Sequence, residues 1–188
     1  MQKPIVTYES LLRITKALST IRDPDEIVLI TVEGVKHALN VKGCTLFLFS
    51  PKTKELKIAG YYGLSDDYID KGPVSAMESI ASSLEDGQPV GIYDVADDPR
   101  IQYPGAAKKE GIASILSTPI VVGERLVGCL RVYTAEPWEF TFNDVNFVQA
   151  VAQVVGMSLE LCRVNKGLKE SIDVLKTMRD PRKLKSMR

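Results

Sequence analysis

Two long β-rich runs, joined by only two residues, say more about the fold of this chain than any other segment. The runs SILSTPIVV and RLVGCLRVYT are rich in the β-branched residues that strands favour. Between them stand Gly123 and Glu124, and the glycine supplies the positive φ that a tight two-residue turn needs. We therefore expect an antiparallel hairpin whose strands are neighbours in the centre of a sheet.

A second hairpin is predicted nearer the N-terminus, in the run CTLFLFSPKTKELKIAGYYGL. Two β-rich stretches there flank a Ser-Pro-Lys-Thr turn. A shorter strand, PVGIYDV, comes between the hairpins, and the turn-rich segment after it has room for one short helix ending at Gly111. The pattern Ser75-x-x-Glu78 predicts a further helix that runs through Leu84.

Helices are predicted at both ends of the chain. Near the N-terminus, apolar residues at 3-4-3 spacing form one narrow stripe: Leu11, Ile14, Leu18 and Ile21. Asp23 then caps a second helix, which has Pro24 at its first position. The buried face of that helix is expected to be Val28, Val32, Val35 and Leu39. Thr141 caps a last, long helix with apolar residues at heptad positions, namely Leu161, Val164, Leu168, Leu175 and Met178.

In order, these elements are helix, helix, hairpin, helix, strand, short helix, hairpin and helix. They predict an α+β fold, an α/β sandwich in which helices pack on one face of an antiparallel sheet. Loops and the short helix are expected on the other face. We divide the chain into an N-terminal helix for dimer contact (residues 1–22), a core domain (23–163) and a C-terminal helical extension with a basic tail (164–188).

The charge of the chain is balanced overall but unevenly distributed. Lys and Arg number 24, as do Asp and Glu. From Lys166 onward there are 8 basic and 3 acidic residues, a net charge of +5, whereas residues 1–165 hold 16 and 21, a net charge of −5. Such a tail can meet nucleic acid, acidic lipid or an acidic protein. A solvated helix end is the simpler interpretation, so we expect no nucleic-acid partner.

The sequence leads us to expect a cytoplasmic protein without a membrane span. No stretch approaches the roughly 18 consecutive apolar residues that a spanning helix needs. The N-terminal MQKPIVTYES lacks the apolar core of a signal peptide. Cys44, Cys129 and Cys162 are odd in number and widely spaced, which suits reduced thiols better than disulfides or a metal site.

Catalytic chemistry has few candidate residues. His37 is the only histidine, and it stands near the end of a predicted helix, where solvation or capping explains it. Asp94, Asp97 and Asp98 form the one dense carboxylate cluster, which turn formation explains better than metal binding. A phosphate-binding glycine loop, zinc-type spacing and HExxH are absent. We therefore expect a protein that is not an enzyme.

Three strings in this order and spacing resemble the GAF domain family over roughly residues 8–163: SIASSLEDGQPVGIYDVADDPR, SILSTPIVVGERLVGCLRVYT and FTFNDVNFVQAVAQVVGMSLEL. The resemblance implies a GAF-like antiparallel sheet of about six strands with a helical dimerisation face on one side. It also implies a pocket between the sheet and the segment around the short helix. Functions within the family vary widely, so the fold alone does not select one.

The branches of the family with known chemistry fit this sequence poorly. Cyclic-nucleotide-binding GAF domains carry an Asn-Lys pair after the last strand, then Phe, three residues and Asp-Glu. Here Tyr133 and Thr134 occupy the pair, Phe140 and Asp144 match, and Val145 replaces the Glu. No Cys-His pair is present to attach a bilin. Free methionine sulfoxide reductases use cysteines in loops over the pocket, whereas the cysteines here fall in predicted strands and a helix.

Strand alternation selects candidate residues for the implied pocket. It places Cys129, Arg131 and Tyr133 on one face of their strand, and this polar set has the better claim to a cavity. The other candidates are Tyr93, Asp94, Ile101, Tyr103, Ser117 and Thr118. Because a guanidinium inside a sheet needs a charged partner, our hypothesis is that Arg131 meets an anionic group. The alternative is an internal salt bridge, for example with Asp94.

These features predict a regulatory sensory module that binds a small molecule or signals through dimer helices, with its output on a separate partner protein. A homodimer is expected through Leu11, Ile14, Leu18, Leu161, Val164 and Leu168. One alternative is a dimerisation scaffold whose pocket is filled by its own side chains. A more remote one is a small redox enzyme of the free methionine sulfoxide reductase type. The sequence identifies no cofactor.

Overall fold

A six-stranded antiparallel sheet forms the centre of the computed structural model, which describes residues 8–75 and 87–179. The strands are β1 (Gly43–Ser50), β2 (Glu55–Tyr62), β3 (Val74–Ser75), β4 (Val90–Ile92), β5 (Ser114–Val122) and β6 (Arg125–Thr134). Their spatial order is β3-β2-β1-β6-β5-β4, and every neighbouring pair is antiparallel. The predicted fold class and strand number are therefore confirmed.

Both predicted hairpins form, and their strands occupy the middle of the sheet. In the second hairpin Val122 pairs with Arg125, and Gly123 turns the chain with φ of +62°. Strand β1 pairs with β2 on one side and with β6 on the other, which joins the two hairpins into one layer. The strands of the second hairpin therefore lie beside each other, as the short turn predicted.

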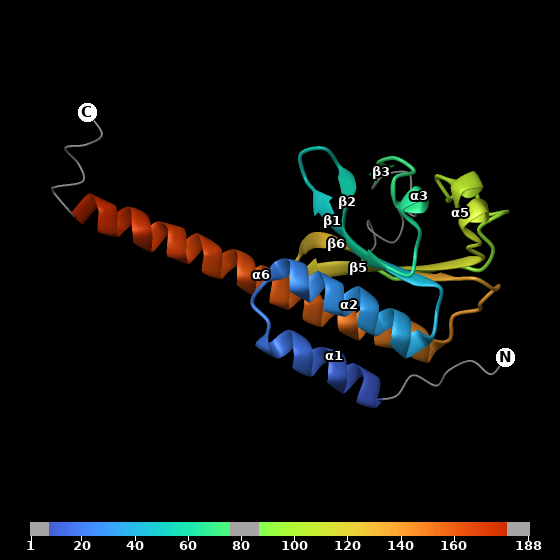
Figure 1. The fold of residues 1–188 in the computed structure, drawn as a ribbon, viewed down its shortest axis with the longest axis horizontal. Helices are drawn as coiled ribbons and strands as arrows, with labels where there is room; N and C mark the ends of the chain where they lie inside the picture. Colours follow the sequence, from blue (N-terminus) through green and yellow to red (C-terminus); the bar gives the residue numbers. More distant parts are fainter. Residues whose placement is uncertain (1–7, 76–86, 180–188) are drawn as a thin grey trace.

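The two faces of the sheet are covered differently, as Figure 1 shows. The helices are α1 (Tyr8–Thr20), α2 (Pro24–Leu39), α3 (Asp66–Ile69), α5 (Pro104–Glu110) and α6 (Phe142–Arg179). Helices α2 and α6 pack on one face with α1 beneath them, while α3, α5 and connecting segments lie on the other. The helix face holds the largest apolar cluster, which includes the predicted buried face of α2: Val28, Val32, Val35 and Leu39.

Local hydrogen bonds start the helices where the sequence predicts. The Asp23 side chain accepts from the backbone N–H groups of Asp25 and Glu26 at the start of α2. Before α6, the N–H and the hydroxyl of Thr141 both donate to Asp144 Oδ2 at 2.8 Å. The N–H of Asp144 in turn donates to the Thr141 hydroxyl at 3.3 Å, which completes a reciprocal cap.

The two halves of helix α6 lie in different environments. Its first half is buried against the sheet through Val148, Val151, Ala152 and Val155, and its second half projects beyond the domain (Figure 1). By length and composition, Phe142–Leu175 is also apolar enough to cross a bilayer, a property that core helices of folded domains share. In that apolar segment, 33% is buried inside the domain.

The α1 stripe points mainly into its own protomer, which corrects part of the predicted dimer contact. Ile14 and Leu18 are buried in the core, so they are not available to a second copy, while Leu11 is half-buried. Leu161, Val164 and Leu168 on α6 are exposed, as the heptad pattern predicts. The dimer itself stays a prediction. Ser75, the first residue of the helix predicted through Leu84, lies in β3. Residues 76–84 and the side chain of Met178 lie outside the part of the chain that the structure describes.

Candidate functional site

The face of the sheet away from the long helices carries a row of buried polar side chains. Arg131 on β6 pairs with Thr45 on β1 and with Ser117 on β5, so all three side chains share this face. Tyr133, two residues along β6, lies on the same face opposite Ile115. Only 4% of Arg131 is exposed. A guanidinium is therefore held in the interior between the sheet and its outer layer.

The outer layer brings further polar groups down onto this row. They come from α3 and the residues after it, and from the segment that leads into α5. A space of about 20 Å³ remains between the layers, enough for about one water molecule. It is lined by Tyr68, Lys71, Val74, Ile101, Gln102, Tyr103, Ile115 and Arg131. Two cationic side chains, one from each layer, thus line the same small space.

Aromatic rings position both cations. The Lys71 ammonium lies 3.8 Å from the centroid of the Tyr68 ring and donates to the Tyr68 carbonyl at 2.9 Å. The Arg131 guanidinium lies 5.1 Å from the centroid of the Phe47 ring. Tyr68 meets Tyr133 edge to face, with ring centroids 5.8 Å apart. Each of the two cations therefore lies near an aromatic ring, Lys71 near Tyr68 and Arg131 near Phe47.

Burial and charge shift the pKa values of the groups at the site. Desolvation, followed by the positive charge of Arg131, lowers the pKa of Lys71 to about 8. Burial raises the pKa of Tyr133 to about 12, although the Arg131 charge acts the other way. Burial also raises the pKa of Tyr68. Near neutral pH both phenols are therefore neutral, while Lys71 is charged but close to its titration.

Ion pairs and hydrogen bonds fasten the outer layer. The Glu110 carboxylate accepts from the backbone N–H of Ser65 at 3.1 Å and from the Ser65 hydroxyl, and Lys42 lies 3.5 Å away. Burial raises the pKa of Glu110, but the hydrogen bonds from Ser65 and the Lys42 charge outweigh it and the pKa is lowered. Lys109 also pairs with Asp67 at 2.9 Å. Helices α3 and α5 are thereby held to each other.

The structure places the predicted site residues in three groups. Ile101, Tyr103 and Arg131 line the space, and Ser117 and Tyr133 adjoin it on the same face. Thr118 follows Ser117 directly, so strand alternation turns it to the helix face, and its assignment to the pocket is corrected.

Tyr93 and Asp94 do not line the space either. Tyr93 is 60% exposed, and its carbonyl accepts from the Ser114 hydroxyl. The Asp94 carboxylate is exposed and accepts from the backbone N–H of Ala96 at 2.9 Å. Asp94 therefore forms a local turn and is not the partner named as the example for Arg131. An internal salt bridge of Arg131 with another residue stays a prediction.

Tyr68, Lys71 and Gln102 are site residues that the sequence reasoning missed. Tyr68 lies in a four-residue helix, and the other two lie in connecting segments. Such segments have no periodicity from which a buried face can be derived. One usable signal was the capping residue Ser65, whose hydroxyl accepts from the N–H of Tyr68 and marks the start of α3.

The cysteines offer no paired reactive centre within the described residues. Cys44 is buried, and burial raises the pKa of its thiol. Cys129 is buried 3.1 Å from the Ser117 hydroxyl, and Cys162 is partly exposed on α6. The part of the chain that the structure describes also contains no group of three or more His, Cys, Asp or Glu residues able to hold a metal.

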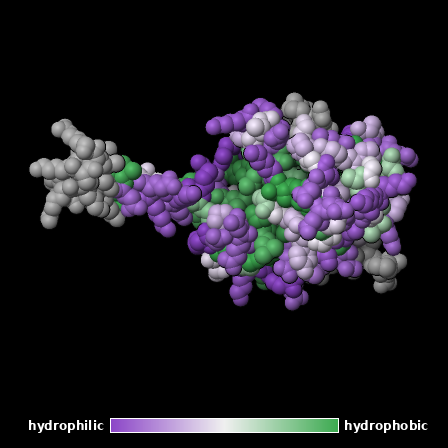
Figure 2. Space-filling view, turned by 45° about the horizontal axis from the view of Figure 1, so that its top comes forward, coloured by the Kyte–Doolittle hydropathy of each residue, from purple (hydrophilic) through white to green (hydrophobic). Residues whose placement is uncertain are grey.

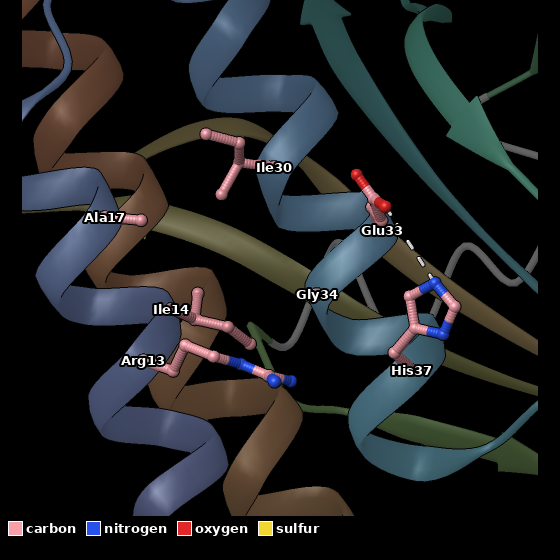
Figure 3. Close-up of a pocket in the computed structure, with 7 residues that line it drawn as sticks. All are labelled: Arg13, Ile14, Ala17, Ile30, Glu33, Gly34 and His37. Atoms are coloured by element: carbon pink, nitrogen blue, oxygen red, sulfur yellow. Dashed lines mark ion pairs between the residues drawn. The ribbon is translucent and has the colours of Figure 1, made fainter.

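A larger, open groove lies on the helix side of the molecule, between α1 and α2 (Figure 3). Its volume is about 610 Å³. Ile14, Ala17 and Ile30 supply its apolar surface, while Arg13, Glu33 and His37 supply polar groups. On successive turns of α2, Oε1 of Glu33 lies 3.9 Å from Nε2 of His37. This groove is lined by two helices, whereas the smaller space on the other face is lined by charged and aromatic side chains from the sheet and its outer layer.

Comparison with known proteins identifies the family of this domain. The sequence profile of the GAF domain matches residues 23–159. No curated protein sequence matches the chain.

Three solved structures show the same fold. The GAF domain of a phosphoenolpyruvate-protein phosphotransferase from Coxiella burnetii is similar, with a TM-score of 0.77, 19% identity, and coverage of 85% of this chain and 95% of that one. The corresponding Acinetobacter domain has a TM-score of 0.73 and 18% identity, with coverage of 83% of this chain and 93% of that one. Free methionine-R-sulfoxide reductase from Neisseria meningitidis, in complex with its substrate, has a TM-score of 0.72 and 18% identity, with coverage of 84% of this chain and 90% of that one. At these identities the likeness concerns the fold, and the profile match shows that the chain belongs to the GAF domain family.

Proposed function

We propose that this GAF domain is a regulatory module that binds a small molecule between the sheet and the α3–α5 layer. One observation carries the proposal: a buried guanidinium, a half-buried amine and the Tyr68 and Tyr103 phenols line one small pocket. Burying such groups costs free energy, and clusters of this kind with shifted pKa values are typical of binding and catalytic sites. The family to which the chain belongs is one of regulatory and sensory domains.

The structure supports a route from this site to the long helix. Ser117 and Arg131 face the site, while their neighbours Leu116 and Leu130 face the helix layer. Helix α6 packs closely on β5, where a Cβ on Gly156 would meet the side chain of Ile120 at 2.9 Å. A ligand that moves β5 or β6 would therefore shift α6, provided that it stabilises one arrangement over the other.

We further propose that α6 joins two copies and passes the change to a separate partner protein in the cytoplasm. Exposed apolar side chains follow α6 at heptad spacing: Met157, Leu161, Val164, Leu168 and Leu175. Figure 2 shows apolar side chains gathered on the domain surface beside the point where the extension leaves it. A groove between α1 and α6, lined in part by Ile21, Met157 and Leu161, continues this surface.

A thermal-shift screen with a metabolite library tests ligand binding. We expect at least one compound to raise the Tm of the parent protein, because a ligand at 100 times its Kd adds about 2.7 kcal/mol to stability. The shift should be lost in Arg131→Ala and kept in Lys109→Ala, since Lys109 is exposed on α5. A library without effect on the parent, or equal shifts in both variants, would contradict the proposal.

Sedimentation of the purified protein tests the dimer. We expect a dimer for the parent and a monomer for Leu168→Glu, because Leu168 is 57% exposed in the apolar stripe. Lys169→Glu, at the next position of the same helix, is the matched control and should stay dimeric. A monomeric parent, or a dimeric Leu168→Glu, would refute association through α6.

A second candidate function is a dimerisation scaffold that binds no ligand. The observation that favours it is the size of the pocket between the layers, since about 20 Å³ holds about one water molecule. A confirmed dimer together with a negative library screen would support this reading.

We propose no catalytic activity for the chain. The Neisseria relative shows that an enzyme can have this fold, but Cys44, Cys129 and Cys162 lie in β1, β6 and α6 and not in loops over the site. A methionine sulfoxide reductase assay on the parent and on the variant with all three cysteines replaced by serine checks this. Activity lost in that variant would overturn the proposal.

A further inference from the structure

The short segment Gly72–Ser75 lies between two hollows of the molecule. One is the small pocket between the sheet and the α3–α5 layer, of about 20 Å³, which Val74 helps to line. The other is a cleft of about 310 Å³ along β2, lined by Glu55, Leu56, Lys57, Ile58, Gly72, Pro73 and Val74. Val74 lines both hollows and is only 3% exposed, so its side chain forms part of the wall between them.

The small pocket needs to enlarge before it can hold a metabolite. Pockets for small molecules usually measure roughly 300–1,000 Å³, whereas about 20 Å³ holds about one water molecule. An outward movement of Gly72–Ser75 would join the small pocket to the cleft along β2 and give a pocket in that range. We propose that Gly72–Ser75 is a strap that lifts away from the sheet and admits the small molecule from the β2 side. The inference rests on the proposed function and specifies how access to the same site is controlled.

The strap is held to the sheet by a short pairing. Within the described residues, β3 pairs with β2 at two positions, Val74 with Leu56 and Ser75 with Glu55. Pro73, the residue before β3, has no N–H to donate to a neighbouring strand. Because most strands have roughly 3–10 residues, detaching this one breaks few ladder contacts.

Gly72 gives the strap a pivot. The chain just before it is tied to α3, because the Lys71 ammonium donates to the Tyr68 carbonyl at 2.9 Å. Gly72 itself has φ of +125°, a conformation that side chains other than glycine rarely adopt. Glycine can leave this conformation at little cost, so a rotation at Gly72 moves the strap while α3 stays in place.

Three hydrogen bonds form a latch that keeps the strap closed. The Tyr103 hydroxyl donates to the Pro73 carbonyl at 2.7 Å, and the Gln102 amide donates to the same carbonyl at 3.3 Å. The backbone N–H of Ser75 donates to Gln102 Oε1 at 3.1 Å. All three bonds join the strap to the two residues before α5. Weakening them therefore shifts the equilibrium toward the open strap.

Two buried cysteines distinguish opening of the strap from unfolding of the domain. Cys129 lies on the pocket side of the sheet in an apolar cluster with Phe47, Leu56 and Val74, so the strap helps to cover it. Cys44 is also 0% exposed, but it belongs to the core cluster on the helix side. Lifting the strap exposes the Cys129 thiol, whereas exposure of the Cys44 thiol needs the helix layer to open.

Labelling with iodoacetamide in a Cys162→Ser background tests the inference, because this small reagent must itself pass the strap to reach Cys129. We expect Cys129 to be labelled faster than Cys44. Tyr103→Phe removes one bond of the latch and should speed the labelling of Cys129 about fivefold, with the Cys44 rate unchanged. Tyr93→Phe, at a tyrosine that is 60% exposed and outside the latch, should behave like the parent. Equal labelling rates for Cys129 and Cys44, or a Cys129 rate unchanged in Tyr103→Phe, would overturn the inference.

Gln102→Ala keeps the test decisive if Tyr103→Phe does not fold. It removes the other two bonds of the latch, so the labelling of Cys129 should speed by more than about fivefold and that of Cys44 should not change. If a metabolite raises the Tm but neither latch variant speeds the labelling of Cys129, the strap is refuted and the proposed function stands. If no metabolite binds but both variants speed the labelling of Cys129 alone, the proposed function fails and the movement of the strap stands.

Discussion

Replacing Gly128 by alanine should strongly destabilise the sheet, because the two central strands leave no room for a side chain there. Gly128 on β6 pairs with Leu48 on β1. A Cβ at this position would lie 2.0 Å from the carbonyl oxygen of Phe47 and 3.2 Å from the Cα of Leu48. Both neighbours are backbone atoms, so no side-chain rotation can relieve the contact.

The size of the effect follows from this geometry. Ordinary van der Waals contact begins near 3.4 Å, so the strands would have to separate by more than about 1 Å at this point. Such a movement breaks about two ladder hydrogen bonds, at about 1 kcal/mol each, and adds an overpacking cost of about 1 kcal/mol or more. The total of about 3 kcal/mol lowers the Tm of a chain of this size by about 6–12 °C.

Thermal unfolding followed by circular dichroism measures this loss. The matched control is Gly167→Ala, since a Cβ on Gly167 in α6 meets no atom within 4 Å. That control should raise stability by up to about 1 kcal/mol through helix propensity. A Tm for Gly128→Ala within about 2 °C of the parent would refute the pairing of β1 with β6 at this register.

Three further changes test other parts of the structure. Asp144→Ala should lower stability by about 1–2 kcal/mol in urea unfolding, because the cap of α6 is lost. Hydrogen bonds from Arg163 help to lower the pKa of Glu160 to about 2. Glu160→Gln should therefore destabilise the protein fully above about pH 5, and this destabilisation should disappear as the pH falls through about 2. Glu110→Gln should loosen the α3–α5 layer. In a background in which serine replaces Cys162, this loosening should speed the thiol labelling of the buried Cys129. An unchanged labelling rate would refute the role of Glu110 in fastening the layer.

Most of the fold could be predicted from the sequence because it follows from local patterns. The turn at Gly123 and the β-branched runs around it predict a hairpin, and the apolar face of α2 predicts which side meets the sheet. The stripe containing Ile14 and Leu18 shows where this reasoning stops. Heptad spacing reveals an apolar seam but does not distinguish packing within one chain from packing between two.

The candidate site could be predicted only where it lies on a regular strand. Alternation along β6 places Arg131 on the face opposite the long helices, which is where the structure has it. The same rule separates Ser117 from Thr118, and assigning both to one pocket ignored it. Lys71 could not be predicted, because its position depends on how the segment after α3 folds over the sheet. That arrangement is tertiary and has no signature in local spacing.

A crystal structure of the parent protein, grown with the compound that raises its Tm most, is the most direct test of ligand binding at this site. We expect non-protein density between the sheet and the α3–α5 layer, in contact with side chains that line the pocket there. A pocket that holds only side chains and a single water in such a crystal would contradict the proposal.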